Sequence, residues 1–310
     1  MQIYLSCWSV RSLLKSGELN FISLPKFARE NGFEGIELFD RLFPSRAVDF
    51  LTQLESALQE NHCGLVVAIG NDFTLADARA WQRQIDHVRG FLEITHFLGG
   101  RVARIFLGGQ GFNIHKVMTW LGEHPLPGQR QSQNLLWQQR LANALLMNRM
   151  TVRLSEMMRK RKSIHDQPQP AMMERCVAAL RQLLPTLDEL DMRIGIENHW
   201  GLSTNPETVV EIIRGVGSPR IGTCPDFGNF AETQDRYAGL QILAPYARHV
   251  HAKSYCFNEA GEETTIDYSR CLRILRDAGY DGAISAEFEG AGDQRLGSQK
   301  TKDLILRHWK

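Results

Sequence analysis

The chain lacks an excess of charge of either sign, because 36 lysine and arginine residues face 35 aspartate and glutamate residues and leave a net charge of +1. This balance excludes the strong global field that attracts nucleic acid or an anionic membrane. No apolar run approaches the length of a membrane span. The opening segment MQIYLSCWSVRSLLKSG has no cationic start followed by a long apolar core, so we expect a cytoplasmic protein without a secretory signal.

Cysteine pairs and phosphate loops are also missing. None of the six cysteines belongs to a CxxC pair, and their scattered spacing predicts reduced, mostly buried thiols. The sequence has no glycine-rich phosphate loop of the P-loop kind that opens a helix.

Eight short apolar runs alternate with longer stretches of helical spacing. The runs are rich in Ile, Val, Leu and aromatic residues and mostly do not alternate with polar residues, which is typical of strands buried on both faces of a parallel sheet. Eight such strands predict one (β/α)8 TIM barrel, an α/β fold that accommodates residues 1–310 as a single domain. The predicted strands are Ile3–Ser9, Gly35–Phe39, Gly64–Ile69, Val102–Leu107, Arg193–Asn198, Arg220–Asp226, His249–Ser254 and Ala283–Phe288.

Local signals support the helices between these runs. Asn205 followed by Pro206 predicts a helix N-cap and first residue, and Asp267 predicts a second cap. Residues 28–37 and 276–285 share a pattern in which a helix ends, a glycine adopts positive φ, an aromatic residue follows and a strand begins.

Residues 111–170, after the fourth strand, interrupt the alternation and are far longer than a plain βα loop. We predict an inserted helical segment on the catalytic face. Three roles remain open for it: a packing or dimerisation arm, a lid over the active site, or nucleic-acid binding through the basic residues 159–162.

Each of the last four strands carries a metal-capable side chain at or near its C-terminal end. These are Glu197 in IGIENHW, Asp226 in TCPDFGN, His249 or His251 in HVHAKS, and Glu287 or Glu289 in ISAEFEG. The intervals from Glu197 through Asp226 and His251 to Glu287 are 29, 25 and 36 residues, about one βα unit each. Such spacing brings the residues to one rim of a barrel, where catalytic residues gather.

Three carboxylates buried together require a cation, and three oxygen donors with one imidazole suit one divalent ion, Mn²⁺, Mg²⁺, Co²⁺ or Zn²⁺.

Together the four motifs resemble the strand-end motifs of the xylose-isomerase-like TIM barrel superfamily, and more narrowly its sugar phosphate isomerase/epimerase branch. The resemblance covers the barrel, about 250 residues, and leaves out the insertion. It implies that the metal ligands are Glu197, Asp226, His251 and Glu287. Ketose 3-epimerases of this superfamily carry a histidine three residues after the aspartate, where this chain has Asn229. That departure argues against a strict ketose 3-epimerase.

The activity implied by the resemblance is isomerisation or epimerisation of a keto-sugar or related polyol, by proton abstraction next to a carbonyl through a metal-stabilised enediolate. Glu197 and Glu287 are then both ligands and catalytic acid/base groups on opposite faces of the carbon. Candidates for contacting the substrate are His199, Lys253, Glu37 and Asn229, and also Asn71 and Asp72.

We expect a small-molecule carbohydrate as the partner, with no nucleic acid and no membrane, and a homodimer or homotetramer as the assembly. Three alternatives stay open. A dehydratase (lyase) acting on a keto-inositol could use the same site. An endonuclease-type phosphodiesterase would need more metal-binding histidines and a basic groove. A non-catalytic binding barrel would have an incomplete ligand set, whereas this chain has all four ligands.

Overall fold

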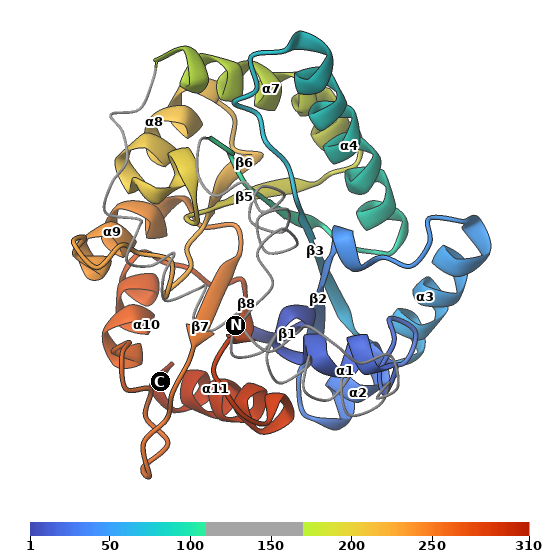
Figure 1. The fold of residues 1–310 in the computed structure, drawn as a ribbon, viewed down its shortest axis with the longest axis vertical. Coiled ribbons are helices and arrows are strands. Elements are labelled where there is room, and N and C mark those ends of the chain that lie inside the picture. Colours follow the sequence, from blue (N-terminus) through green and yellow to red (C-terminus); the bar gives the residue numbers. More distant parts are fainter. Residues whose placement is uncertain (110–169, 310) are drawn as a thin grey trace, which may run out of the picture.

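The computed structural model describes residues 1–109 and 170–309. Within these ranges, eight parallel strands form one sheet in the order β6-β5-β4-β3-β2-β1-β8-β7, and helices surround it (Figure 1). This arrangement confirms the predicted (β/α)8 barrel. The strands are β1 (Gln2–Ser6), β2 (Gly35–Phe39), β3 (Gly64–Ile69), β4 (Val102–Ile105), β5 (Arg193–Glu197), β6 (Ile221–Cys224), β7 (Val250–Ser254) and β8 (Ala283–Phe288).

The strand bounds follow the apolar runs closely, and β2, β3 and β8 have the predicted bounds at both ends. The largest difference is the first strand, predicted to reach Ser9 but ending at Ser6. There the Ser6 hydroxyl oxygen accepts a hydrogen bond from the Trp8 backbone N–H at 3.3 Å and begins a 3-10 helix, Cys7–Val10. A local side-chain cap therefore ends the strand although the apolar pattern continues.

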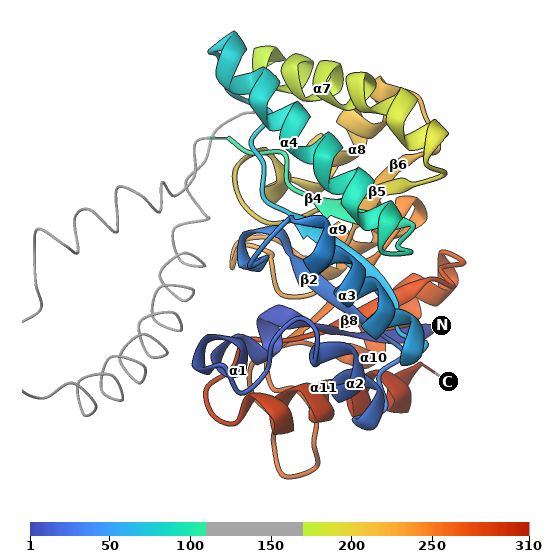
Figure 2. The ribbon, with the colours of Figure 1, turned by 90° about the vertical axis from the view of Figure 1, so that its right-hand side faces the viewer.

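The helices lie outside the strands, as Figures 1 and 2 show from two directions. Both predicted caps are confirmed: Asn205 accepts from the Thr208 N–H at 2.8 Å, and Asp267 accepts from the Arg270 N–H at 2.9 Å. The described helices are α1 (Arg11–Ser16), α2 (Leu24–Glu30), α3 (Val48–Glu60), α4 (Ala78–Phe97), α7 (Pro170–Glu189), α8 (Pro206–Val216), α9 (Arg236–Leu243), α10 (Tyr268–Asp277) and α11 (Gln294–His308).

The two turns predicted to share one pattern are also confirmed. Gly32 and Gly279 both have a φ of 75°. In each turn the backbone N–H of the aromatic residue after the glycine donates a hydrogen bond to a carbonyl of the preceding helix. Phe33 donates to the Ala28 carbonyl at 2.9 Å, and Tyr280 donates to the Leu275 carbonyl at 3.0 Å. A side chain at either glycine would be strained, so glycine sets the direction in which the chain enters β2 and β8.

The barrel closes between β6 and β7 through isolated bridges instead of a regular ladder. One bridge pairs Thr223 with Ala247, and the other pairs Asp226 with His251. Pro225 has no N–H to donate, but its carbonyl accepts from the His251 N–H at 2.9 Å, and the Phe227 N–H donates to the His251 carbonyl at 3.1 Å. This seam brings two of the predicted metal ligands side by side.

The predicted helical insertion, residues 111–170, lies outside the described residues except for Pro170, where α7 begins. Its three candidate roles therefore stay predictions. Five of the six cysteines are buried thiols and Cys256 is exposed, as expected for reduced cysteines. Among the helices of residues 1–109 and 170–309, none is long and apolar enough to cross a lipid bilayer.

Candidate metal centre

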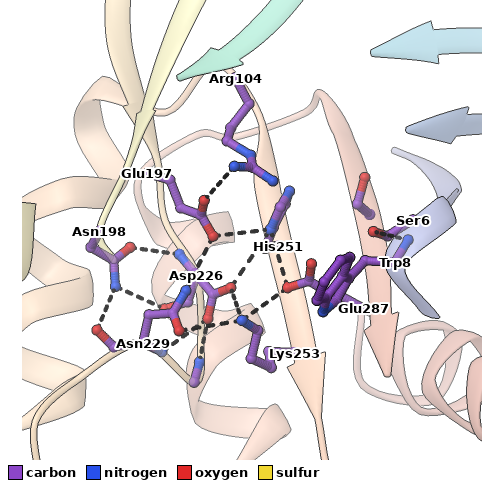
Figure 3. Close-up of polar contacts among 12 residues, drawn as sticks. Ser6, Trp8, Arg104, Glu197, Asn198, Asp226, Asn229, His251, Lys253 and Glu287 are labelled. Atoms are coloured by element: carbon purple, nitrogen blue, oxygen red, sulfur yellow. Dashed lines mark hydrogen bonds and ion pairs between the residues drawn. The ribbon is translucent and has the colours of Figure 1, made fainter. Parts of the chain in front are cut away.

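The side chains of the four predicted ligands converge, as Figure 3 shows. Glu197 ends β5, Asp226 follows β6, His251 is the second residue of β7, and Glu287 is the last but one of β8. One donor atom from each lies within 4.8 Å of those from the other three, and all four side chains are buried. His251 Nδ1 lies 3.3 Å from a Glu197 oxygen, 3.6 Å from an Asp226 oxygen and 3.4 Å from a Glu287 oxygen. The predicted set therefore forms one compact cluster around the imidazole.

Strand register explains why these side chains meet. His251 and Lys253 on β7, and His249 directly before it, occupy alternate positions and therefore point to the same face. Lys253 pairs with Glu287 on β8, so these two residues stand at the same height in the barrel. The ligands thus reach the cluster from neighbouring βα units.

Asp226 is oriented by the loop that follows β6. Its Oδ1 atom accepts backbone N–H groups from Gly228 at 2.7 Å and Asn229 at 2.9 Å. The Asn198 amide holds the backbone of Asp226, accepting from its N–H at 2.7 Å and donating to its carbonyl at 3.1 Å. These bonds leave the Oδ2 atom directed at His251 and Lys253. Asn198 was not among the predicted site residues.

Several buried polar atoms of the cluster have no hydrogen-bond partner among the described residues, which fits a site that binds a cation. Buried polar atoms are almost always hydrogen-bonded. Among residues 1–109 and 170–309, however, each of the four candidate ligands contributes one buried atom with no hydrogen-bond partner: Glu197 Oε2, Asp226 Oδ2, His251 Nδ1 and Glu287 Oε2. In these ranges the three oxygens have only the ion pairs to Arg104 and Lys253 and the imidazole as polar neighbours. Three carboxylate oxygens and one imidazole nitrogen form a donor set suited to Mn²⁺, Mg²⁺, Co²⁺ or Zn²⁺.

The charges also fit a divalent ion. Four carboxylates with at most 4% exposure lie in or beside the cluster, and the buried cations beside them are Arg104 and Lys253. Two negative charges are therefore left for a metal ion to neutralise. The four carboxylates belong to Glu37, Glu197, Asp226 and Glu287.

Arg104, on β4, is a site residue that the sequence analysis missed. Its guanidinium lies 2.9 Å from Glu197 and 3.4 Å from Glu37, and it also stacks 4.6 Å from the Phe106 ring centre. The signal that could have identified it is a charged residue in the middle of an otherwise apolar strand, VARI. Such a residue is buried only where other charges compensate it.

Glu37, predicted to contact substrate, lies beside His251 on the side away from the other ligands. Its two oxygens are 2.9 and 2.7 Å from His251 Nε2, whereas Nδ1 of the same ring faces the other ligands. His249 lies 3.4 Å from Glu37 and 2.7 Å from the Ser285 hydroxyl. The geometry thus agrees with the choice of His251 over His249 as the ligand.

Of the other predicted substrate-binding residues, Asn229 and Lys253 contact the candidate ligands, whereas the contact described for His199 is with an aromatic ring. Asn229 donates to Glu197 at 3.1 Å and accepts from Lys253 at 3.2 Å, and Lys253 also lies 3.0 Å from Glu287, so both belong to the cluster. His199 is half-buried and packs edge-on against Phe106, with ring centres 5.2 Å apart.

Asn71 and Asp72 have local partners. Asn71 binds the Phe106 backbone in both directions, at 2.8 and 3.0 Å, and Asp72 accepts from the backbone and hydroxyl of Thr74. These bonds join the ends of neighbouring strands and shape a turn. They give no indication that either residue reaches the metal cluster.

The packed charges shift the pKa values of the cluster. Burial lowers the pKa of His251, but the nearby carboxylates, led by Glu37, outweigh burial and raise it well above its ordinary value. Burial raises the pKa of Glu287, but Lys253 and His251 outweigh burial and hold it well below the ordinary range. Without a metal, the cluster therefore favours ionised carboxylates around a protonated imidazole.

Comparison with known proteins shows the family and supports the fold. The family model described as xylose isomerase-like TIM barrel matches residues 25–307, so the chain belongs to this family. The D-psicose 3-epimerase of Clostridium cellulolyticum H10 has the same fold, with a TM-score of 0.69 at 12% identity over 100% of both chains. The 3-keto-D-glucoside 4-epimerase of E. coli gives 0.65 at 13% identity over 99% of each chain. A family member from Mycobacterium smegmatis in complex with magnesium gives 0.61 at 13% identity over 93% of this chain and 88% of its own.

Curated relatives with sequence similarity include subunits of deglycosidases. The 3'-dehydrocarminate deglycosidase alpha subunit of Microbacterium sp. is 24% identical over 187 residues, which cover 36% of this chain and 54% of the relative. The C-glycoside deglycosidase alpha subunit of Arthrobacter globiformis is 38% identical over 196 residues, which cover 41% and 56%. The chain thus spans about half the length of the curated relatives it matches.

Proposed function

We propose that this protein is a divalent-metal-dependent epimerase or isomerase of a keto-sugar or related polyol. The observation that carries the proposal is the convergence of four candidate ligands from four successive βα units, each with one buried atom that has no hydrogen-bond partner among the described residues. A divalent ion held by Glu197, Asp226, His251 and Glu287 would supply a Lewis acid for the substrate carbonyl, and so would make the neighbouring C–H easier to deprotonate. The magnesium complex of one structural neighbour supports a divalent ion without fixing its identity.

Glu197 and Glu287 are the proposed acid/base groups. In Figure 3 they lie on either side of His251, and each is held by a neighbour: Glu197 by the Asn229 amide and Glu287 by the Lys253 ammonium group. One carboxylate removes the proton next to the carbonyl, and the other, as a carboxylic acid, returns a proton to the opposite face, which gives epimerisation. Return of the proton to the adjacent carbon gives isomerisation.

The comparisons extend the candidate substrates from free keto-sugars to glycosides that carry a keto group. The names of the 4-epimerase of E. coli and the deglycosidase subunit of Microbacterium sp. both describe a glycoside oxidised at position 3. Such a ring has an acidic C–H on either side of its carbonyl. Both reactions could therefore begin by proton removal next to the carbonyl, from C4 for 4-epimerisation and from C2 for loss of the group on C1. A keto-glycoside is also compatible with Asn229, which replaces the histidine of the ketose 3-epimerases.

A second candidate function is elimination, favoured by the similarity to deglycosidase subunits. The first step would be the same removal of a proton next to the carbonyl. The electron pair would then form a double bond to the next carbon while the bond to the leaving group breaks, and the leaving group would take up a proton. The dehydratase alternative is the case in which the leaving group is water.

The first experiment measures the metal. Purified protein is analysed for Mn, Mg, Co and Zn, and the metal-stripped protein is titrated with Mn²⁺ by calorimetry. We expect one ion per chain in the wild type and loss of that binding in Glu197→Gln. If the wild type binds no divalent ion near one equivalent, the proposed function is wrong.

The second experiment identifies the reaction. The metal-loaded protein is incubated in D₂O with keto-sugars, 3-keto-glucosides, inososes and C-glycosides oxidised at position 3, and the products are followed by NMR. Deuterium at the carbon next to the carbonyl without loss of a group indicates epimerisation or isomerisation. A free aglycone or a deoxy-dicarbonyl product indicates elimination. The Glu287→Gln variant should lower the exchange rate by about 10²- to 10⁴-fold, as expected for removing an acid/base group.

A further inference from the structure

We infer that Glu37 is a positioning residue of the metal centre, which holds His251 with its Nδ1 atom facing the other ligands. The inference rests on the metal site of the proposed function. Glu37 is 1% exposed on β2, and β2 does not pair with any strand that carries a ligand. It therefore reaches His251 across the interior of the barrel, from the side of the ring opposite the other three ligands.

The contact determines which nitrogen of the ring is available to a metal. Both Glu37 oxygens lie within 2.9 Å of His251 Nε2, so this nitrogen carries the proton and donates it to the carboxylate. When the ring gives up its second proton to bind a metal, the lone pair is therefore on Nδ1, which lies 3.3 to 3.6 Å from oxygens of Glu197, Asp226 and Glu287. A carboxylate that accepts from the second nitrogen of a ligating histidine fixes the tautomer and the ring orientation.

Glu37 is itself held by two further contacts. His249 lies 3.4 Å from Oε2 and is anchored by Ser285 at 2.7 Å. Arg104 lies 3.4 Å from Oε1 and reaches Glu197 with its other end, at 2.9 Å. The Glu37 carboxylate thus contacts His251 directly and Glu197 through the buried Arg104 guanidinium. The orientations of His251 and Glu197 therefore both depend on Glu37.

Glu37, His249 and His251 also bring three donor atoms close enough for an ion of their own. Two observations argue that no ion binds there. The donors of this group are already hydrogen-bonded to one another and to Ser285. The Arg104 guanidinium also lies against Glu37 and would repel a cation. We therefore expect one metal ion per chain, bound by Glu197, Asp226, His251 and Glu287 and not by this second group.

The test compares Glu37→Gln with Asp40→Asn as a matched control. Asp40 follows β2 and pairs with His87 at 2.7 Å, so its variant also removes one buried negative charge beside a histidine. Mn²⁺ binding to metal-stripped protein is measured by calorimetry, and folding is checked by circular dichroism. We expect Glu37→Gln to bind Mn²⁺ about 10- to 100-fold more weakly, and Asp40→Asn to bind within about twofold of the wild type.

A second measurement on the unmodified protein does not depend on how a variant folds. In protein labelled with ¹⁵N-histidine and loaded with Zn²⁺, the His251 signal should show a protonated Nε2 and a metal-bound Nδ1. Metal bound through Nε2 would overturn the inference, as would unchanged Mn²⁺ affinity in Glu37→Gln or two ions per wild-type chain. Absence of Mn²⁺ binding to the wild type would instead refute the proposed function.

Discussion

The Arg104→Met substitution tests whether the cluster depends on its buried cations. Arg104 faces two carboxylates, Glu197 at 2.9 Å and Glu37 at 3.4 Å, and the residue is 7% exposed. With an effective dielectric constant of about 20, each pair contributes about 5–6 kcal/mol of attraction, which the desolvation of the three groups largely offsets. Removing one partner of such a pair leaves the carboxylates uncompensated and costs about 3–5 kcal/mol.

The assay is urea unfolding of metal-stripped protein, followed by circular dichroism. With a slope of about 3 kcal/mol per molar urea, we expect the midpoint of Arg104→Met to fall by about 1–2 M. The control is Arg89→Met, which removes an exposed i,i+3 pair with Asp86 and should cost less than about 1 kcal/mol. An Arg104→Met midpoint equal to or above that of the wild type would refute the assignment of Arg104 as a required counter-charge.

Two further predictions follow from the site and the fold. The carboxylates around His251 raise its pKa well above the ordinary value, so the metal-free ring is protonated at neutral pH and must lose a proton when Nδ1 binds a metal. Mn²⁺ affinity should therefore rise between pH 6 and pH 8.5, with proton release visible by calorimetry in buffers of different ionisation enthalpy. A flat pH profile would contradict this. A Cβ at Gly222 on β6 would overlap the Tyr246 carbonyl oxygen, whereas one at Gly90 on α4 meets nothing within 4 Å. Gly222→Ala should therefore lower the melting temperature by many degrees, and Gly90→Ala should leave it unchanged or raise it, because alanine stabilises a helix by up to about 1 kcal/mol. Equal melting temperatures for the two variants would show that β6 and the Tyr246 loop are not packed as described.

The convergence of the four candidate ligands could be predicted because barrel topology leaves few choices. Consecutive parallel strands joined by helices end on the same rim, so residues one βα unit apart at strand ends meet in space. Glu197 and Asp226, 29 residues apart, needed no tertiary information beyond that rule. The choice of His251 over His249 came from the family motif, and the hydrogen bonds of the two rings agree with it.

The roles of Glu37 and Arg104 beside the cluster could not be assigned from the sequence, because their contacts cross the interior of the barrel. Register gives the neighbours of Glu37 as Ser6 on β1 and Val66 on β3, yet its functional contacts come from β4 and β7. Such contacts depend on the tilt and closure of the whole barrel, which no local pattern encodes. The length of the first strand was mispredicted for a local reason, since a single serine hydroxyl ended it.

Glu37, Arg104, His249 and Ser285 form a polar layer beside the candidate metal centre, and metal binding explains this layer better than stability does. The interior of a (β/α)8 barrel is usually filled by layers of branched aliphatic side chains. Here Glu37, Arg104, His249 and Ser285 take part of that space, all at most 7% exposed. A fully apolar layer would be at least as stable, because buried ion pairs rarely exceed hydrophobic packing in stability. An apolar layer could not select the tautomer of His251 or hold Glu197, however. Compared with an apolar layer, the polar layer is therefore expected to increase metal affinity without increasing stability, and this separates it from the aliphatic core of the same strands.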